Sequence, residues 1–224
     1  MSPTRRFFLE TAAANAAAFA VLPGTLLAGL PRDLVPPVSS DDWDLSWSDK
    51  IKGKYRACFD CAEVESGYGV WRASAWANQT RDVMKAAPAE VSPVIVLRHN
   101  AIVLAMQQSF WDKYAIGQSK KVTDPLTSEP TTKNPALLDE KDGLPAPFNT
   151  AGLHKQLARG VTALACNLAL QDCIELIKTK DKVAEEEARK RAIAYLVPGV
   201  ILQPSGVFAA IRAQQVGSAY VKAS

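Results

Sequence analysis

The sequence predicts an α/β fold in which helices cover both faces of a mostly parallel sheet. Strand-like and helix-like segments alternate along the chain after residue 50, which is typical of βαβ units. Residues 94–97 form a continuous apolar run, as expected of a strand buried on both faces of a parallel sheet. The composition agrees, because 48% hydrophobic and 22% charged residues are ordinary values for a globular domain.

The order of the elements follows from hydrophobic periodicity and from helix and turn signals. Five strands are expected, at residues 54–59, 94–97, 161–165, 200–202 and 218–221. Helices are expected at 69–86, 101–116, 150–159, 167–195 and 205–216, the fourth of them loosened near 179–182. Ser205 is a suitable N-cap for the last helix and Gly217 a suitable stop.

The N-terminus matches the twin-arginine export pattern: a small polar residue, Arg5 and Arg6, any residue, then Phe-Leu. A mildly apolar, Ala-rich run continues to about Leu30 and is weaker than a typical membrane span. We expect residues 1–30 to be a signal peptide that is recognised by the Tat translocase, cleaved near Ala28 and excluded from the fold. The mature protein would then be periplasmic. An uncleaved membrane anchor is the alternative.

Two further segments differ from the rest of the chain. Residues 31–49, rich in proline and aspartate, are expected to be an extended arm that Trp43 and Trp47 dock on the domain or on a neighbouring subunit. The domain itself is expected to span 50–224. Its loop at 118–148 holds five prolines, and loops of this length are usually functional or disordered. The topology places this loop near the carboxyl ends of the strands or against a partner subunit, and a mobile surface loop is the alternative.

Ligands of open α/β sheets bind beyond the carboxyl ends of the strands. The candidate site residues expected there are Cys61, Arg98, His99, Asn100, Cys166, Asn167, Gln203 and Ser205. Asp60 and Glu63 also follow the first expected strand but have no assigned role. Cys166 lies where a strand turns into a helix, and the helix N-terminus favours the nucleophilic thiolate. The alternative is that Cys166 is a small buried hydrophobe. His99 is expected either to bind a ligand or transfer a proton, or to be structural.

Other chemistry at the same positions has less support. The spacing of Cys58 and Cys61 resembles a redox motif. A disulfide could join Cys61 to Cys166. Alternatively, a zinc site with an open position would take three ligands, Cys61, His99 and Cys166. Cys173 is expected in the core. The formal net charge of +3, without a Lys/Arg stripe, argues against nucleic acid as a partner. No Gly-rich phosphate loop follows the first strand, which argues against nucleotide binding.

Four segments resemble twin-arginine-exported members of the DsrE-type (DsrE/DsrF-like) sulfur-relay family. They are VLRHNAI at 96–102, VTDP at 122–125 with KNP at 133–135, LACNLA at 164–169, and VPGVILQPSGV at 197–207 followed by RAQ at 212–214. The resemblance implies a three-layer α/β/α domain with a five-stranded sheet, often assembled into homo-oligomers. It also implies that a cysteine beyond a strand end carries sulfur as a persulfide, and Cys166 occupies the matching position.

The first functional hypothesis is therefore an exported sulfur-handling protein. Cys166 would take sulfane sulfur from a donor protein and pass it to an acceptor, while Arg98 and His99 hold an anionic sulfur species. The persulfide sulfur on Cys166 is the single bound group that this hypothesis implies, and no other cofactor is expected. The first alternative is a non-catalytic periplasmic binding or assembly module that acts as a homo-oligomer. The second is a Cys/His metal-binding protein.

Overall fold

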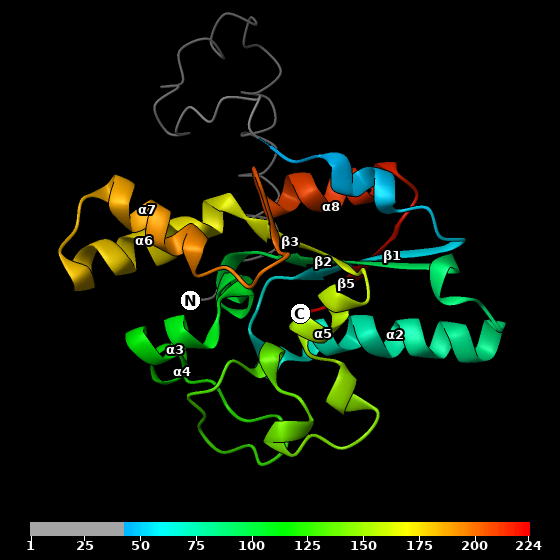
Figure 1. Ribbon diagram of the computed structural model, residues 1–224, viewed down its shortest axis with the longest axis horizontal. Coiled ribbons are helices and arrows are strands. Elements are labelled where there is room, and N and C mark those ends of the chain that lie inside the picture. The colour runs from blue at the N-terminus through cyan, green and yellow to red at the C-terminus, as the bar shows by residue number, and fades with distance from the viewer. Residues whose placement is uncertain (1–42) are drawn as a thin grey trace, which may run out of the picture. The chain divides into compact units, whose positions relative to one another are not determined.

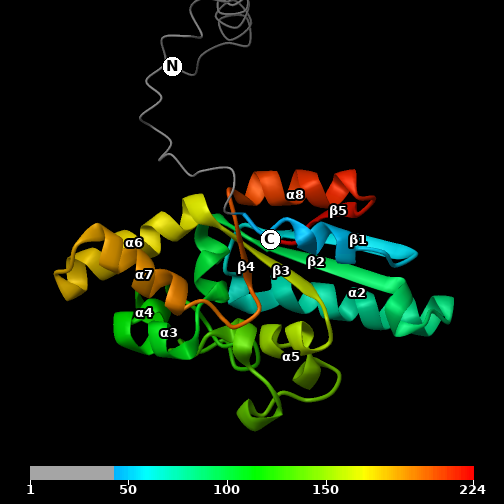
Figure 2. The same cartoon turned by 45° about the horizontal axis from the view of Figure 1, so that its top comes forward.

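The computed structural model describes residues 43–224 and contains a five-stranded sheet in which all strands are parallel. The strand order is β4-β3-β2-β1-β5 (Figures 1 and 2). The strands are β1 (Tyr55–Cys61), β2 (Val91–Leu97), β3 (Thr162–Cys166), β4 (Ile201–Gln203) and β5 (Ala219–Lys222). Helices lie on both faces of the sheet, so the predicted three-layer α/β/α class is confirmed.

The two faces carry different helices (Figures 1 and 2). One face is covered by α8 (Gly206–Gln215) and the 3-10 helix η3 (Ser46–Lys50). The other is covered by α2 (Tyr68–Met84), with α5 (Leu153–Ala158) and the long loop beside it. Outside the long loop and its C-terminal end, the other helices are η4 (Glu65–Gly67), η5 (Pro88–Glu90), η6 (His99–Ala105), α3 (Gln108–Tyr114), α4 (Ile116–Ser119), α6 (Asn167–Asp181) and α7 (Glu185–Ala194).

Each face of the sheet buries its own apolar cluster because side chains alternate along a strand. Phe59 and Cys61 of β1 belong to the larger cluster, on the α2 face. Cys58 belongs to the smaller cluster under α8. Asp60 follows the same alternation and is buried on the α8 face. A buried carboxylate needs hydrogen-bonding partners, and these build the site described below.

The helix expected over residues 101–116 is wrong, because the structure divides this segment into η6, α3 and α4. Met106 forms an antiparallel bridge with Leu196, and Val197 N–H donates to Ala105 O over 2.8 Å. Backbone groups that pair with a distant segment cannot continue a helix. Ala115 then adopts a φ of +51° and separates α3 from α4. The expected break in the fourth helix is confirmed, since α6 ends before Lys182, whose φ is +55°.

The described end of the predicted arm packs on the domain of the same chain. Trp47, in η3, is completely buried in the smaller cluster. Gln203 Nε2 donates to the carbonyl of Asp44 over 2.8 Å, and Arg212 donates to Ser48 Oγ over 3.2 Å. The predicted signal peptide, with Arg5 and Arg6, lies outside the described residues. None of the helices from residue 43 onwards combines the length and apolar character needed to cross a bilayer.

The loop at 118–148 is anchored at several points rather than detached. Ser66 and Thr123 hydroxyls lie 3.0 Å apart, and Tyr68 donates to the carbonyl of Pro125 over 3.2 Å. The buried Asn134 side chain donates to two carbonyls that follow β2, those of Leu104 and Met106. Short 3-10 helices η7 (Pro135–Leu137) and η8 (Glu140–Asp142) lie within the loop, and η9 (Phe148–Thr150) follows. The loop therefore packs beside the carboxyl edge, as the topology predicts.

Candidate functional site

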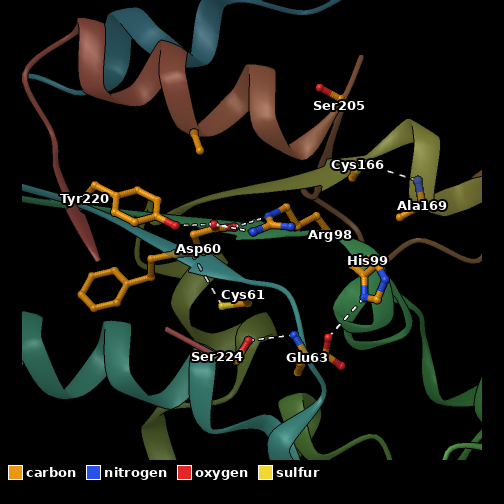
Figure 3. A network of polar contacts seen from close by, with 12 residues as sticks. Asp60, Cys61, Glu63, Arg98, His99, Cys166, Ala169, Ser205, Tyr220 and Ser224 are labelled. Atoms are coloured by element: carbon orange, nitrogen blue, oxygen red, sulfur yellow. Dashed lines mark hydrogen bonds and ion pairs between the residues drawn. The ribbon is translucent and has the colours of Figure 1, made fainter. Parts of the chain in front are cut away.

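The carboxyl ends of four adjacent strands meet at one edge of the sheet (Figure 3). The register pairs Cys61 with Leu97, Leu97 with Ala165, and Cys166 with Gln203. All eight candidate site residues end one of these strands or lie within three residues of its end. The structure divides them into separate groups, each with its own partners.

A buried carboxylate organises the first group. Arg98 Nε and Nη2 donate to the two oxygens of Asp60 over 2.6 and 2.9 Å, and the Tyr220 hydroxyl donates to Oδ2 over 2.7 Å. The Asp60 side chain is 4% exposed and that of Arg98 32%. Burial raises the pKa of Asp60, but the hydrogen bonds from Arg98 and Tyr220 outweigh it and the net pKa is lowered. The hydrogen bond to Asp60 in turn raises the pKa of Arg98, so both groups stay charged.

Arg98 is also held by close packing under α8. A Cβ added to Gly206 would lie 2.5 Å from Arg98 Cβ, so the stem of the arginine occupies the space that a side chain would need. Ser205 Oγ accepts the N–H of Phe208 over 3.0 Å and caps α8, as predicted. Arg98 Nη1 has no hydrogen-bond partner among the described residues. Its N–H groups are the part of this guanidinium that remains available to a ligand.

His99 and Asn100 belong to a second, exposed group built around Glu63. His99 Nδ1 lies 3.2 Å from Glu63 Oε1, and Asn100 Nδ2 donates to Glu63 Oε2 over 2.8 Å. Lys120, from the long loop, donates to Asn100 Oδ1 over 2.9 Å. His99 adopts a φ of +49°, a conformation that few non-glycine residues adopt. Figure 3 shows the imidazole beside Glu63, apart from the Asp60 network.

Cys166 differs from the other three cysteines. It is the N-cap of α6, and its Sγ accepts the N–H of Ala169 at 3.4 Å. Cys58, Cys61 and Cys173 are each at most 2% exposed, whereas Cys166 is 6% exposed. Burial raises the pKa of Cys58 and of Cys173 to about 12 and also raises that of Cys61. Cys173 therefore lies in the core, as predicted, and Cys166 is the thiol best placed for chemistry.

Asn167 and Gln203 have structural partners. Asn167 is buried, and its Oδ1 accepts a hydrogen bond from Arg189 of α7 over 2.9 Å. Gln203 is fully buried and donates to the carbonyl of Asp44. Its Oε1 has no partner among the described residues. Both side chains hold neighbouring segments against the edge.

The structure separates Cys61 from Cys166. They lie on β1 and β3 with β2 between them, which corresponds to about 10 Å at the usual spacing of strands. A disulfide requires its two Cα atoms to be within about 7 Å. Moreover, Cys61 faces α2, where a Cβ on Gly69 would lie 2.7 Å from its sulfur. The alternative of a Cys61–Cys166 disulfide is therefore wrong.

The zinc site and the redox motif lack the geometry they need. Among residues 43–224, no group of three or more His, Cys, Asp or Glu side chains is arranged to hold a metal. Cys58 and Cys61 lie on opposite faces of β1, in different clusters, and all four cysteines are free. A redox pair needs adjacent sulfurs, so the interpretation of Cys58 and Cys61 as a redox motif is wrong.

Asp60 and Glu63 were expected after the first strand without an assigned role, and Tyr220 was not expected at the site. Asp60 and Glu63 are close to the end of β1, and a charge inside the otherwise apolar second half of β1, residues 57–61, was a usable signal for Asp60. Tyr220 reaches the site because β5 pairs with β1, and no local sequence pattern predicts that pairing. Comparison with protein-family models, curated proteins and solved structures finds no match to this chain. The DsrE-type resemblance therefore rests on the four sequence segments alone.

Proposed function

We propose that this protein accepts and passes on sulfane sulfur through Cys166, after export to the periplasm. The observation that carries the proposal is the environment of the Cys166 sulfur. It accepts a backbone N–H in the first turn of the 15-residue helix α6, at the edge where α/β sheets bind ligands. Helix N-termini favour anions, and the persulfide that the proposal places on Cys166 is an anion.

The chemistry is thiol–sulfane exchange and needs no external oxidant. The Cys166 thiolate attacks the terminal sulfur atom of a polysulfide and forms a new S–S bond with it. The S–S bond next to the attacked atom breaks, and its electron pair leaves on the shortened polysulfide. An acceptor thiolate then attacks the outer sulfur of the persulfide, and Cys166 leaves as a thiolate. Charge and atoms balance in each step.

Two neighbouring groups suit an anionic donor. The Nη1 donors of Arg98 are free of partners among the described residues, although the bidentate bond to Asp60 neutralises much of the charge. His99 is 65% exposed at the same edge. Both are assigned here to binding the sulfur species, with His99 also able to exchange protons. The small exposure of Cys166 favours slender ligands such as polysulfide.

The test is intact-protein mass spectrometry after incubation with polysulfide. We expect the wild-type protein to gain one sulfur atom that reductant removes, and Cys166→Ser to gain none. Cys173→Ala is the matched control, because it removes a thiol two helical turns further along α6 and leaves Cys166 in place. A gain that persists in Cys166→Ser, or no gain in the wild-type protein, would contradict the proposal.

A second candidate, the assembly module, is favoured by one observation. The outer face of α8 carries Val207, Phe208 and Ile211, which are 59%, 39% and 50% exposed. Apolar residues grouped on one helix face often mark subunit contacts. Native mass spectrometry should then show a homo-oligomer that Ile211→Lys dissociates. A monomeric wild-type protein at micromolar concentration would remove the support for this candidate.

A further inference from the structure

We propose that Glu63 is a positioning residue for His99, which holds the imidazole with its proton on Nδ1 and leaves Nε2 free as a proton acceptor. The role of that acceptor rests on the proposed sulfur chemistry. The arrangement itself rests only on the contacts among two short segments that follow β1 and β2.

Backbone hydrogen bonds tie these two segments together. Arg98 N–H donates to the Cys61 carbonyl and Ala101 N–H to the Ala62 carbonyl, both over 3.0 Å. Glu63 N–H donates to the Ser224 hydroxyl over 2.8 Å (Figure 3). The positions of the Glu63 and His99 backbones are thereby fixed relative to each other.

The side chains of this group fix the direction of the Glu63 carboxylate. Its Oε2 accepts from Asn100, whose own Oδ1 accepts from Lys120. Its Oε1 therefore faces His99 Nδ1, at 3.2 Å. At this distance the negative carboxylate repels a lone pair on Nδ1 and attracts a proton there, so the contact favours the tautomer that carries its proton on Nδ1. In the neutral imidazole, Nε2 is then an acceptor.

The second histidine shows the opposite arrangement. His154 Nε2 lies 3.4 Å from Asp139 Oδ2, so its carboxylate faces the other ring nitrogen. The same reasoning places the proton of neutral His154 on Nε2. Since the chain has two histidines, each serves as the internal reference for the other.

The stability of the fold gains little from the pair of His99 and Glu63. The His99 and Glu63 side chains are 65% and 49% exposed, and exposed ion pairs contribute little to folding. In the proposed reaction a Cys166 thiol must lose its proton before it attacks, and we assign the acceptance of that proton, directly or through water, to His99 Nε2 at the same edge. Glu63 acts on this step through His99 and touches no reacting atom.

The test is two-dimensional long-range ¹H–¹⁵N NMR of the full chain at a pH where both imidazoles are neutral. We expect an Nδ1–H tautomer for His99 and an Nε2–H tautomer for His154. Glu63→Ala should leave His99 as a mixture of both tautomers without changing His154. The matched control is Glu65→Ala, which removes a nearby carboxylate that pairs with Arg72 instead. An Nε2–H tautomer in the wild-type protein, or no change in Glu63→Ala, would overturn the proposal.

Sulfur uptake by Cys166 provides the second measurement. We expect Glu63→Ala to slow uptake by on the order of tenfold, and the double variant with His99→Ala to be no slower than His99→Ala alone. Unchanged uptake in Glu63→Ala, despite a changed tautomer, overturns the positioning role while the sulfur function stands. If the wild-type protein takes up no sulfur, the sulfur function fails, and the tautomer alone then decides whether Glu63 orients His99.

Discussion

Asp60 and Glu63 are two carboxylates three residues apart, each paired with a cationic or basic side chain that follows β2. Asp60 is 4% exposed and accepts three hydrogen bonds, whereas Glu63 is 49% exposed and faces solvent with His99. Removing one member of a buried ion pair is costly, and removing one member of an exposed pair costs little. We infer that Asp60 stabilises the carboxyl edge of the sheet and that Glu63 acts in the reaction proposed for that edge.

The largest expected effect is that of Asp60→Ala. It leaves the Arg98 guanidinium without its counterion under α8, and we expect the free energy of unfolding to fall by about 3 kcal/mol. Urea denaturation measures this loss. Glu63→Ala is the matched control, for which we expect a change of about 0.5 kcal/mol or less. Equal losses in the two variants would contradict the inference that Asp60 stabilises the fold much more than Glu63 does.

Gly206→Ala should have the next largest effect. Its new Cβ would lie 2.5 Å from Arg98 Cβ, so either the arginine or the first turn of α8 must move. We expect a loss of roughly 2 kcal/mol, as for other overpacked sites. Val207→Ala, at the neighbouring exposed position, should change the stability by only about 0.5 kcal/mol. A Gly206→Ala protein as stable as wild type would show that Arg98 is not confined by α8.

Tyr220→Phe should have a smaller effect. It removes one hydrogen bond to Asp60 and keeps the ring on β5, while the bidentate bond from Arg98 remains. We expect a loss of about 1 kcal/mol in thermal or urea unfolding. No loss would indicate that Arg98 alone satisfies the Asp60 carboxylate.

Acidification should have the smallest effect on stability, and it tests the lowered pKa of Asp60. Because the folded pKa of Asp60 lies below its ordinary value of 3.8, its contribution to stability is present above pH 3.8 and is lost as the pH falls through the lowered folded pKa. The free energy of unfolding, measured between pH 5 and the lowest pH that keeps the protein folded, should therefore fall less steeply in Asp60→Asn than in wild type. Equal slopes would contradict the assigned pKa direction.

The sequence predicted much of the fold because its signals are local. The apolar run at 94–97, the Ser205 cap and the break near residue 182 each depend on neighbouring residues, and each is present in the structure. The helix expected over 101–116 failed because Met106 pairs with Leu196, a contact between residues far apart in the chain. Periodicity within a window cannot reveal such a contact.

The candidate site was predictable in position but not in its internal partners. The strand ends placed Arg98, His99 and Cys166 at one edge. Which residues face one another depends on the order of the strands as well as on the direction of each side chain, and that order places β2 between Cys61 and Cys166. Tyr220 reaches Asp60 from 160 positions away, through strand pairing that single-sequence reasoning does not provide.

The alternation of β1 has one more consequence, for the thiols that the fold encloses. Cys58 is buried beneath α8 and Cys61 is buried beneath α2, so the sheet lies between the two thiols. A sulfhydryl reagent should label Cys166 first, and the three enclosed cysteines should follow only as the layers open. The two layers need not open together. The labelling rate of Cys58 would therefore report the opening of the α8 layer, and the labelling rate of Cys61 the opening of the α2 layer.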